Sequence, residues 1–599
     1  MRASDTSFRN RLALSGVLAV ALIASIAGVA TLPASAKSQS GGTVTFAQQP
    51  GNVPNYIFPI TAANSYVSGN LTFFQPLLWR PLYWLGDGTK PVISKSLSLA
   101  DPPTFSDGGR TVNITLKPYK WSDGQPVTSR DVEFFLNLLK AGKNNWGGYS
   151  PGEFPDNVAS FAINSPSSFS LTFNNVYARE WIENNELSAI VPLPQQAWDK
   201  TSASGAVGDY DLTASGATAV YNYLNQQALS LNTYATNPLW QEIDGPFRMT
   251  AYSAETNYVA FAPNPHYSGP IKPRISKLIE APFTSEFAEY DALRSGQVDY
   301  GYLPSTDLHQ TSYFKAKGDT VEPWSSWGVD YMVINFTNPK LKSYFKQLYI
   351  RQALQLTVNQ PALIKDTLNG YGQPIDGPIP IDPKGPLVSP LEAKNPYPYN
   401  PAKAAKLLRE HGWKVVRDGT DTCLKPGDGS GQCGAGIAKG AALSFPVIYP
   451  SGVASIADGV QAWKSWASTV GITLNIRELP LQQIGDIANI CTTGATCTWG
   501  LANWEGWGFQ SPYPTGEETF SAIQTGGYRS ATNDANITAT QRSSNPSAMF
   551  NYEDYLAKNL PVIWWPNSPS QISVISGKLH EVTQNALGSF TPEEWSLRG

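Results

Sequence analysis

The chain has 599 residues, of which 41% are hydrophobic and 15% are charged, and its net charge is −4. This length predicts two or three domains, and the composition excludes a disordered chain or a coiled coil. The small net charge gives no indication of an electrostatic partner such as nucleic acid or an anionic membrane. Aromatic residues are plentiful, with 18 Trp, 28 Tyr and 24 Phe. Most are assigned to core packing, and the rest are candidates for the walls of a ligand cleft.

The first 36 residues have the pattern of an export signal. Three arginines precede an apolar run from Val17 to Leu32, and Ala34-Ser35-Ala36 resembles a cleavage site before Lys37. The apolar run is about 16 residues long, shorter than the roughly 20 that a membrane-spanning helix needs. Residues 1–36 are therefore predicted to be a signal peptide, and the protein to be periplasmic or at the outer face of the cytoplasmic membrane. An uncleaved signal that serves as an anchor is the alternative.

Strand patterns recur along the mature chain. Residues 42–47 are predicted as a first strand, and residues 110–116 alternate polar and apolar side chains as a half-buried strand does. Later strands are predicted at 443–449 and 472–476, with a helix at 456–470 between them. This alternation of strands and helices predicts α/β domains.

Two helices have clear start signals. Thr128 is followed three residues later by Asp131, which is the spacing of a capping box. Asn400-Pro401 combines a good N-cap with a proline at the first helical position, and Gly412 is expected to close that helix.

The four cysteines form two local pairs, Cys423 with Cys433 and Cys491 with Cys497. An even number of cysteines in an exported chain predicts disulfides, and the two short loops are favoured among the three possible connectivities. A zinc site is the alternative, but the four histidines of the chain are widely scattered. We expect neither a metal nor a cofactor.

The sequence gives little indication of catalytic machinery. There is no H-E-x-x-H metal motif. Glu593 and Glu594 are adjacent, so they do not face each other on a helix or a strand, and we expect them on the solvated surface. The protein is predicted not to be an enzyme; a secreted hydrolase with an unrecognised site is the alternative of another class.

Residues 120–132, Lys-Trp-Ser-Asp-Gly-Gln-Pro-Val-Thr-Ser-Arg-Asp-Val, resemble a motif of the extracellular solute-binding proteins of family 5. This family is the oligopeptide-, dipeptide- and nickel-binding group that serves ABC importers. Ser129 stands in place of the family's usual Ala. Further segments resemble family motifs in the family's order and extend the resemblance over nearly all of the mature chain: 244–248, 263–267, 292–299, 333–336, 349–354, 400–413 and 560–563.

The resemblance implies an α/β fold of the two-lobed, flytrap-like periplasmic-binding-protein type, with three domains. The ligand would lie between the lobes and favour their closure, and the importer would recognise the closed form. The implied division is lobe I at 37–78, 239–324 and 564–599, a small inserted domain attached to lobe I at 79–238, and lobe II at 325–563.

The resemblance also implies where ligand contacts lie. Peptide binders of the family carry an Asp in a Gly-Trp-x-x-Asp segment that pairs with the amino terminus of the peptide. Trp504 matches the family Trp, whereas Trp507 stands where the Asp would be, and Glu505 is a candidate substitute. An aromatic residue at that position suits stacking on a sugar ring. The ligand-binding candidates are Trp504, Glu505, Trp507 and Phe509, followed by Trp324, Trp327, Asn64, Ser65 and Tyr66.

The predicted function is therefore the substrate-binding component of an ABC importer. The expected ligand is an oligopeptide-like solute, because that is the family's commonest activity, and an oligosaccharide is the alternative. The expected partners are the permease subunits of the transporter. We expect a monomer that does not bind nucleic acid.

Overall fold

The computed structural model describes residues 41–598, except residues 51, 489–496, 505, 515, 517–519 and 521–525. The predicted signal peptide, Cys491 and Glu505 lie outside the described residues. Within the described part of the chain, no helix is both long and apolar enough to cross a membrane.

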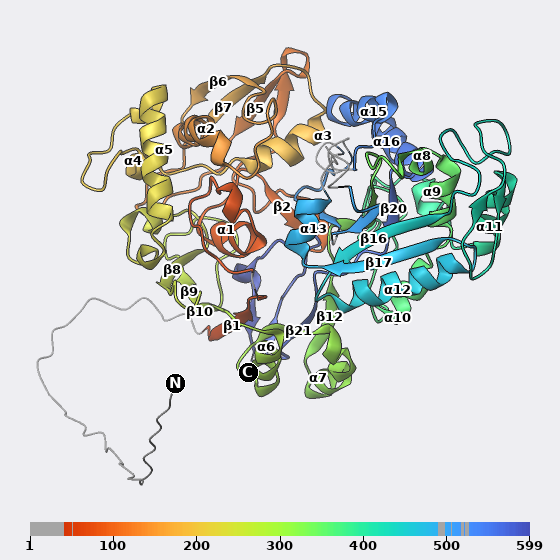
Figure 1. Ribbon diagram of the computed structural model, residues 1–599. Coiled ribbons are helices and arrows are strands. Elements are labelled where there is room, and N and C mark those ends of the chain that lie inside the picture. Colours follow the sequence, from red (N-terminus) through yellow and green to blue (C-terminus); the bar gives the residue numbers. More distant parts are fainter. Residues whose placement is uncertain are drawn as a thin grey trace, which may run out of the picture. The chain divides into compact units, whose positions relative to one another are not determined.

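The largest sheet has seven strands (Figure 1). The predicted first strand forms β1 (Thr43–Ala47), whose Val44 and Phe46 side chains are buried. β1 pairs in parallel with two strands that lie more than 200 residues away in the sequence, whereas the other pairs in the sheet are antiparallel. In spatial order the strands are β12 (Thr320–Trp324), β21 (Gln571–Ile575), β11 (Tyr300–Leu303), β1, β10 (Lys277–Ala281), β9 (Val259–Pro263) and β8 (Phe247–Tyr252).

A second sheet has six strands and is built from the later part of the chain. Its β13 is buried along its whole length and pairs with β18, β19 and β20. The strands are β17 (Thr473–Leu479), β16 (Ser444–Pro450), β18 (Leu501–Asn503), β13 (Gly328–Ile334), β19 (Trp507–Gly508) and β20 (Val562–Trp565). Two connections join this sheet to the first one: residues 325–327 lead from β12 to β13, and residues 566–570 lead from β20 to β21.

The remaining strands form smaller sheets. The four-stranded antiparallel sheet contains β4 (Thr104–Ser106), β5 (Thr111–Thr115), β7 (Ser168–Phe173) and β6 (Val158–Ser165). The two-stranded pairs are β2 (Trp84–Asp87) with β3 (Lys90–Ser94), β14 (Trp413–Lys414) with β15 (Thr422–Cys423), and β22 (Leu579–His580) with β23 (Ser596–Leu597).

Helices cover these sheets. α2 and α5 pack against each other, and α12 packs against β16 and β17 (Figure 1). The described α-helices are α1 (Gln75–Leu78), α2 (Ser129–Gly142), α3 (Arg179–Trp181), α4 (Gln195–Trp198), α5 (Ala214–Ala228), α6 (Glu286–Ser295), α7 (Thr311–Lys317), α8 (Lys342–Phe345), α9 (Leu348–Gln355), α10 (Gln360–Asp366), α11 (Pro401–Glu410), α12 (Ala454–Ser468), α13 (Leu481–Ile487), α15 (Ala531–Arg542) and α16 (Pro546–Asn559).

Both predicted helix starts are confirmed. Thr128 and Asp131 form the capping box of α2, in which the Thr128 N–H donates to the Asp131 carboxylate at 2.7 Å. The Asn400 side chain accepts from the Lys403 N–H at 2.9 Å at the start of α11. Gly412 follows that helix with φ 77°, a left-handed conformation that favours glycine.

The first predicted disulfide is confirmed. Cys423 and Cys433 are bonded, with their Cα atoms 6.1 Å apart, and both residues are buried. The bond closes the glycine-rich loop that follows β15. The second predicted pair includes Cys491, which lies outside the described residues.

The surface position expected for Glu593 is wrong. Its side chain is fully buried and forms an ion pair with Arg80, which is also fully buried. The partner lies 513 residues earlier in the sequence, so the local pattern around Glu593 contains no sign of it.

Candidate functional site

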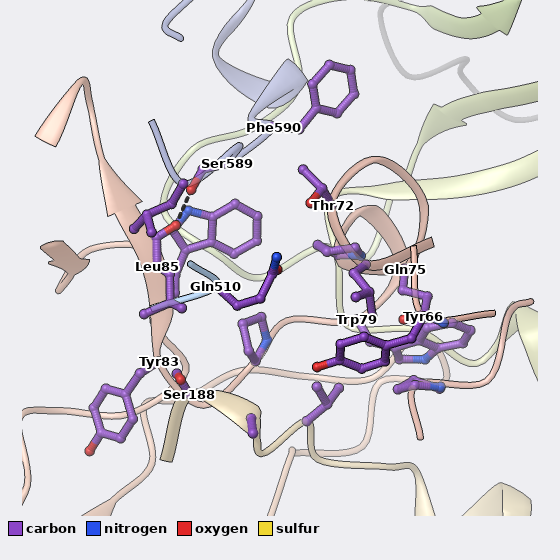
Figure 2. Close-up of a pocket in the computed structure, with 18 of the residues that line it drawn as sticks. Tyr66, Thr72, Gln75, Trp79, Tyr83, Leu85, Ser188, Gln510, Ser589 and Phe590 are labelled. Carbon is purple, nitrogen blue, oxygen red and sulfur yellow. Dashed lines mark hydrogen bonds between the residues drawn. The ribbon is translucent and has the colours of Figure 1, made fainter. Parts of the chain in front are cut away.

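Two adjoining cavities lie beside the chain that follows β1, and the second of them also touches the two connections between the large sheets. The first has a volume of about 200 Å³ (Figure 2), and the second has a volume of about 300 Å³. Thr72, Gln510 and Leu587 line both cavities, so the two are neighbours.

The second cavity is built from segments that are far apart in the sequence. β1 and the residues after it contribute one wall, and the β12–β13 connection contributes another. The residues that follow β19 complete it from the six-stranded sheet. The lining residues group as 46–49, 52, 68, 72–73, 324, 326–327, 508–510, 570–571 and 586–588.

Hydrogen bonds fix the β12–β13 connection in this cavity wall. The Trp327 N–H donates to the Ala586 carbonyl at 2.9 Å, and its indole N–H donates to the Ser511 carbonyl at 3.0 Å. The Phe509 N–H in turn donates to the Trp327 carbonyl at 2.8 Å. One aromatic residue therefore ties together the connection, the segment after β19 and the C-terminal part of the chain.

Aromatic rings form a continuous surface in this wall. Phe73 is half-buried and has its ring centroid 5.3 Å from Phe46, 6.1 Å from Trp324 and 5.2 Å from Phe590. Phe46, Phe73 and Trp324 all line the second cavity. Phe46 and Trp324 are buried, and the Trp324 and Phe590 rings stand nearly perpendicular to that of Phe73. Phe73 is therefore the ring of this set that offers a partly exposed apolar surface to a ligand group.

The first cavity has neutral polar groups among its aromatic walls. The Gln75 amide donates to the Tyr56 and Phe58 carbonyls, at 3.0 and 3.1 Å, so this side chain is held by the protein itself. Tyr66 lies beside it and is partly exposed (Figure 2). Gln510, also exposed, lies among the labelled residues of this cavity (Figure 2).

No Asp, Glu, Lys, Arg or His occurs among the described residues that line either cavity. Behind the wall of the first cavity, the Arg80 guanidinium lies 4.1 Å from the centroid of the Trp84 ring and is paired with Glu593. Burial acts to lower the pKa of Arg80, but the Glu593 charge keeps it above its ordinary value. The two charges therefore balance each other inside the protein.

A carboxyl group also lies behind the second cavity. Glu280 is fully buried in β10 and accepts from the Gln48 amide at 3.1 Å. Burial raises the pKa of Glu280 to about 8, so this group is mostly uncharged at neutral pH. Gln48 lines the second cavity.

The structure brings together some of the residues predicted from the sequence. Trp324, Trp327 and Phe509 line the second cavity, and Tyr66 lines the first. Glu505 lies outside the described residues.

The other candidates line neither cavity. Trp504 is half-buried with its ring 6.2 Å from that of Tyr331, and Trp507 pairs with Val329 in the sheet. Asn64 is exposed and Ser65 is buried in a short 3-10 turn.

Sequence reasoning missed Phe73, Thr72 and Gln510. Phe73 belongs to an apolar, aromatic segment of the chain, and nothing in this segment distinguishes a cavity ring from a core ring. Gln510 directly follows the predicted Phe509, so proximity to that candidate was the one available signal.

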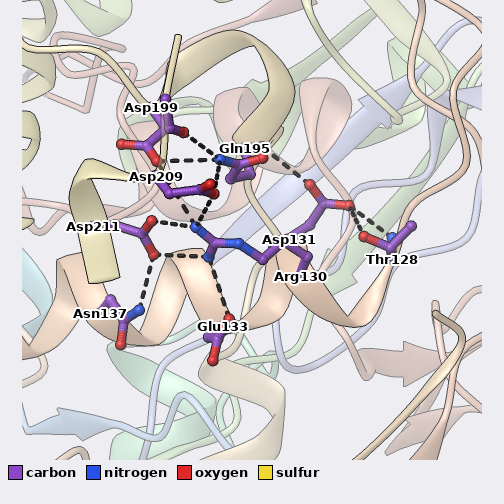
Figure 3. Close-up of polar contacts among 10 residues, drawn as sticks. Thr128, Arg130, Asp131, Glu133, Asn137, Gln195, Asp199, Asp209 and Asp211 are labelled. Atoms are coloured by element: carbon purple, nitrogen blue, oxygen red, sulfur yellow. Dashed lines mark hydrogen bonds and ion pairs between the residues drawn. The ribbon is translucent and has the colours of Figure 1, made fainter. Parts of the chain in front are cut away.

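A separate acidic cluster surrounds Arg130 at the start of α2 (Figure 3). Oxygens of Asp199, Asp209 and Asp211 lie within 4.8 Å of one another. The Arg130 guanidinium reaches all three, at 2.8 Å from Asp211, 3.3 Å from Asp209 and 3.8 Å from Asp199. Because this guanidinium already supplies the positive charge, we interpret the cluster as a link between α2 and the loop at 199–211.

A further contact joins the segment at α3 to the end of α15. The Ala178 N–H donates to the Gln541 carbonyl at 2.8 Å, and the Arg542 guanidinium lies 4.2 Å from the centroid of the Tyr177 ring. We call these four residues the bridging contact. It connects the part of the chain that carries the four-stranded sheet to the helices beside the six-stranded sheet.

Comparison with known proteins identifies a family. Residues 96–527 match the family described as bacterial extracellular solute-binding proteins, family 5, middle part. A Brucella ovis protein named for peptide binding in an ABC transporter is 26% identical over 391 residues. The match covers 64% of this chain and 63% of that protein, so it spans less than two thirds of the relative's length.

Solved structures share the fold. The oligopeptide-binding protein AppA of Bacillus subtilis, in complex with a nonapeptide, has a TM-score of 0.64 and 17% identity, with 94% of this chain and 100% of AppA covered. NikA of Brucella suis, in complex with Fe(III)-EDTA, has a TM-score of 0.67 and 16% identity, with coverages of 93% and 100%. The predicted α/β fold of the periplasmic-binding type is confirmed, but at such identities nothing follows about the solute.

Proposed function

Because this chain belongs to the bacterial extracellular solute-binding proteins of family 5, we propose that it is the substrate-binding component of an ABC importer. In this role it captures an oligopeptide-like solute and delivers it to the permease subunits from outside the cytoplasmic membrane. The protein acts by binding and has no catalytic step. The Brucella relative, named for peptide binding in an ABC transporter, supports the transport role.

The observation that supports capture is the make-up of the second cavity. Its lining comes from strands of the seven-stranded sheet, from the last residue of β19 in the six-stranded sheet with the two residues that follow it (508–510), and from the β12–β13 connection between the sheets. In the proposal, the two sheets are the cores of lobes I and II. A solute that touches both lobes stabilises their closed arrangement, because it makes these contacts in that state alone.

The aromatic wall around Phe73 favours an oligosaccharide as the second candidate. A sugar ring stacks on such a face, whereas a peptide would use main-chain hydrogen bonds.

A thermal-shift screen tests the proposal. Peptides of two to nine residues and neutral oligosaccharides are added in excess over the protein. A ligand present at about 100 times its Kd stabilises the folded state by about 2.7 kcal/mol. A rise in Tm with one class and none with the other identifies the solute. Hydrolysis of any compound during the assay, followed by chromatography, would contradict the absence of catalysis.

The location of the site is tested with a pair of aromatic variants. Phe73→Ala removes a half-buried ring from the wall of the second cavity, and we expect it to raise the Kd of the best ligand about tenfold. Trp507→Ala removes a half-buried ring that lines neither cavity, so we expect a change of less than about twofold. Isothermal titration measures both values. The opposite order would favour the site predicted from the sequence over the cavities.

The bridging contact is expected to stabilise the closed arrangement. Arg542→Ala removes a cation–π contact of about 0.5–2 kcal/mol, which corresponds to a two- to thirtyfold increase in Kd if the contact forms on closure. Arg529→Ala serves as the control because Arg529 is exposed outside the contact. Equal affinities for Arg542→Ala and the wild type would show that the contact is present in both arrangements.

A further inference from the structure

The two cavities share a chemical character that restricts the solute. Their described lining residues are aromatic rings, aliphatic and proline side chains, hydroxyl groups and amides. None of these lining residues is Asp, Glu, Lys, Arg or His.

A charged ligand group needs a partner when it leaves water. Burying an unpaired carboxylate or ammonium group costs far more free energy than burying a neutral group that keeps its hydrogen bonds. The ionic groups behind the walls do not supply such a partner. Arg80 is already paired with Glu593, and Glu280 is held with Gln48 at full burial.

The neutral groups, in contrast, are placed to bind. Gln49 donates to the Gln571 amide oxygen at 3.2 Å, and Gln571 donates to the Ser573 hydroxyl at 2.9 Å. Gln49 and Gln571 line the second cavity, and both side chains are half-buried. An amide has two donor hydrogens and two acceptor lone pairs. Gln49 also donates to the Ser570 carbonyl at 3.2 Å, so its two hydrogens are used and its oxygen can accept from a ligand hydroxyl or amide, whereas Gln571 keeps one hydrogen and one lone pair.

Gln510 has a special place in this lining. It is exposed, it lines both cavities, and it belongs to the segment that follows β19 of the six-stranded sheet. A ligand that extends from one cavity into the other passes the three residues common to both linings, Gln510, Thr72 and Leu587.

We propose that the paired cavities take an uncharged solute with at least two units, one in each cavity, whose flat faces stack on the aromatic walls and whose hydroxyl or amide groups bind the glutamines. Gln510 contacts the junction between the units. The proposal rests on the proposed importer function. It narrows the solute to uncharged compounds, and so it excludes oligopeptides with free, ionised termini from the candidates named there. Neutral carbohydrates and peptides without ionised termini share this chemistry.

Matched pairs of compounds test whether the solute must be uncharged, and they distinguish carbohydrates from peptides. The carbohydrate pair is cellotriose and its aldonic acid, cellotrionic acid; the peptide pair is N-acetyl-tetraalanine amide and free tetraalanine. By isothermal titration, the neutral member of one pair is expected to bind at least about tenfold more tightly than its charged counterpart. Its Kd is expected to change less than about twofold between 0.05 and 0.5 M NaCl, because no ion pair contributes.

A charge placed at the junction gives an independent test. Gln510→Glu is expected to raise the Kd of the preferred neutral compound about tenfold, because the new carboxylate loses water when the ligand covers it. Gln461→Glu, on the exposed face of α12, is the matched control and should leave the Kd unchanged.

The outcomes separate the two levels of the proposal. Three outcomes would overturn the uncharged solute while leaving the importer role intact. They are tighter binding of the charged member of either pair, a Kd that rises more than tenfold with salt, and equal Kd values for Gln510→Glu and Gln461→Glu. Absence of binding by all four compounds and by every compound of the thermal-shift screen would overturn both.

Discussion

Arg80→Ala is expected to lower the free energy of unfolding by about 3–5 kcal/mol, among the largest effects of any single substitution in this chain. The guanidinium and the Glu593 carboxylate are both fully buried, and their pairing joins the segment after α1 to the C-terminal end of the chain. Removing Arg80 leaves the Glu593 charge buried without its partner. It also removes the cation that lies against the Trp84 ring. Urea unfolding at pH 7, followed by tryptophan fluorescence, measures the change.

Two further variants show whether the loss comes from an unpaired charge. The double variant Arg80→Met/Glu593→Met removes both charges at similar volume, and we expect it to be considerably more stable than Arg80→Ala. Lys406→Ala breaks an exposed ion pair with Glu410 on α11 and should leave stability almost unchanged, because solvent screens that pair. If the double variant is as unstable as Arg80→Ala, the packing of the arginine side chain decides its effect and the charge does not.

Features that depend on neighbouring residues could be predicted from the sequence. The capping box at Thr128 involves atoms three residues apart, and the Cys423–Cys433 disulfide closes a short loop. The expected strand at 443–449 corresponds to β16, and the expected helix at 456–470 corresponds to α12, each within about two residues at its ends. In these segments local preference and the final structure agree.

Features that depend on long-range pairing could not be predicted in the same way. β1 pairs with β10 and β11 across more than 200 residues, and a five-residue strand contains no information about which strands will be its neighbours. The residues alone predicted α/β domains, and the family resemblance supplied the periplasmic-binding type of fold.

The candidate site shows the same limit. Trp504 and Trp507 are prominent in the sequence, but a tryptophan in or beside a strand can pack inward or line a cleft with equal local preference. Trp327 and Phe509 are held at the second cavity by long-range hydrogen bonds. Trp327 donates to the Ser511 and Ala586 carbonyls, and the Phe509 N–H donates to the Trp327 carbonyl. Those contacts bring together segments some 180 and 260 residues apart, which the sequence around each tryptophan does not reveal.

The pH dependence of stability is expected to show a large contribution from Glu280. Burial raises the pKa of this carboxyl to about 8, and the Gln48 amide donates to it, whereas an unfolded glutamate has a pKa of about 4.3. Between these two values the folded state keeps a proton that the unfolded state has lost. The stability that depends on protonated Glu280 is therefore fully present below about pH 4. It is lost as the pH rises, and the loss levels off above about pH 8.

Glu280→Gln removes this titration while keeping a neutral side chain of the same shape. Between pH 4 and pH 9 the wild type should therefore lose stability relative to the variant. The expected loss in unfolding free energy is several kcal/mol, roughly 5 at most. Urea unfolding at pH 4, 6, 8 and 9 measures this difference. The effects of other buried carboxyl groups on the pH dependence cancel in the difference, because both proteins contain these groups. Glu478→Gln, at an exposed position of β17, is the matched control and should give a profile parallel to that of the wild type. A parallel profile for Glu280→Gln as well would mean that Glu280 is already ionised in the folded protein. A charge would then lie directly behind the second cavity, and the uncharged surroundings proposed for the solute would not hold.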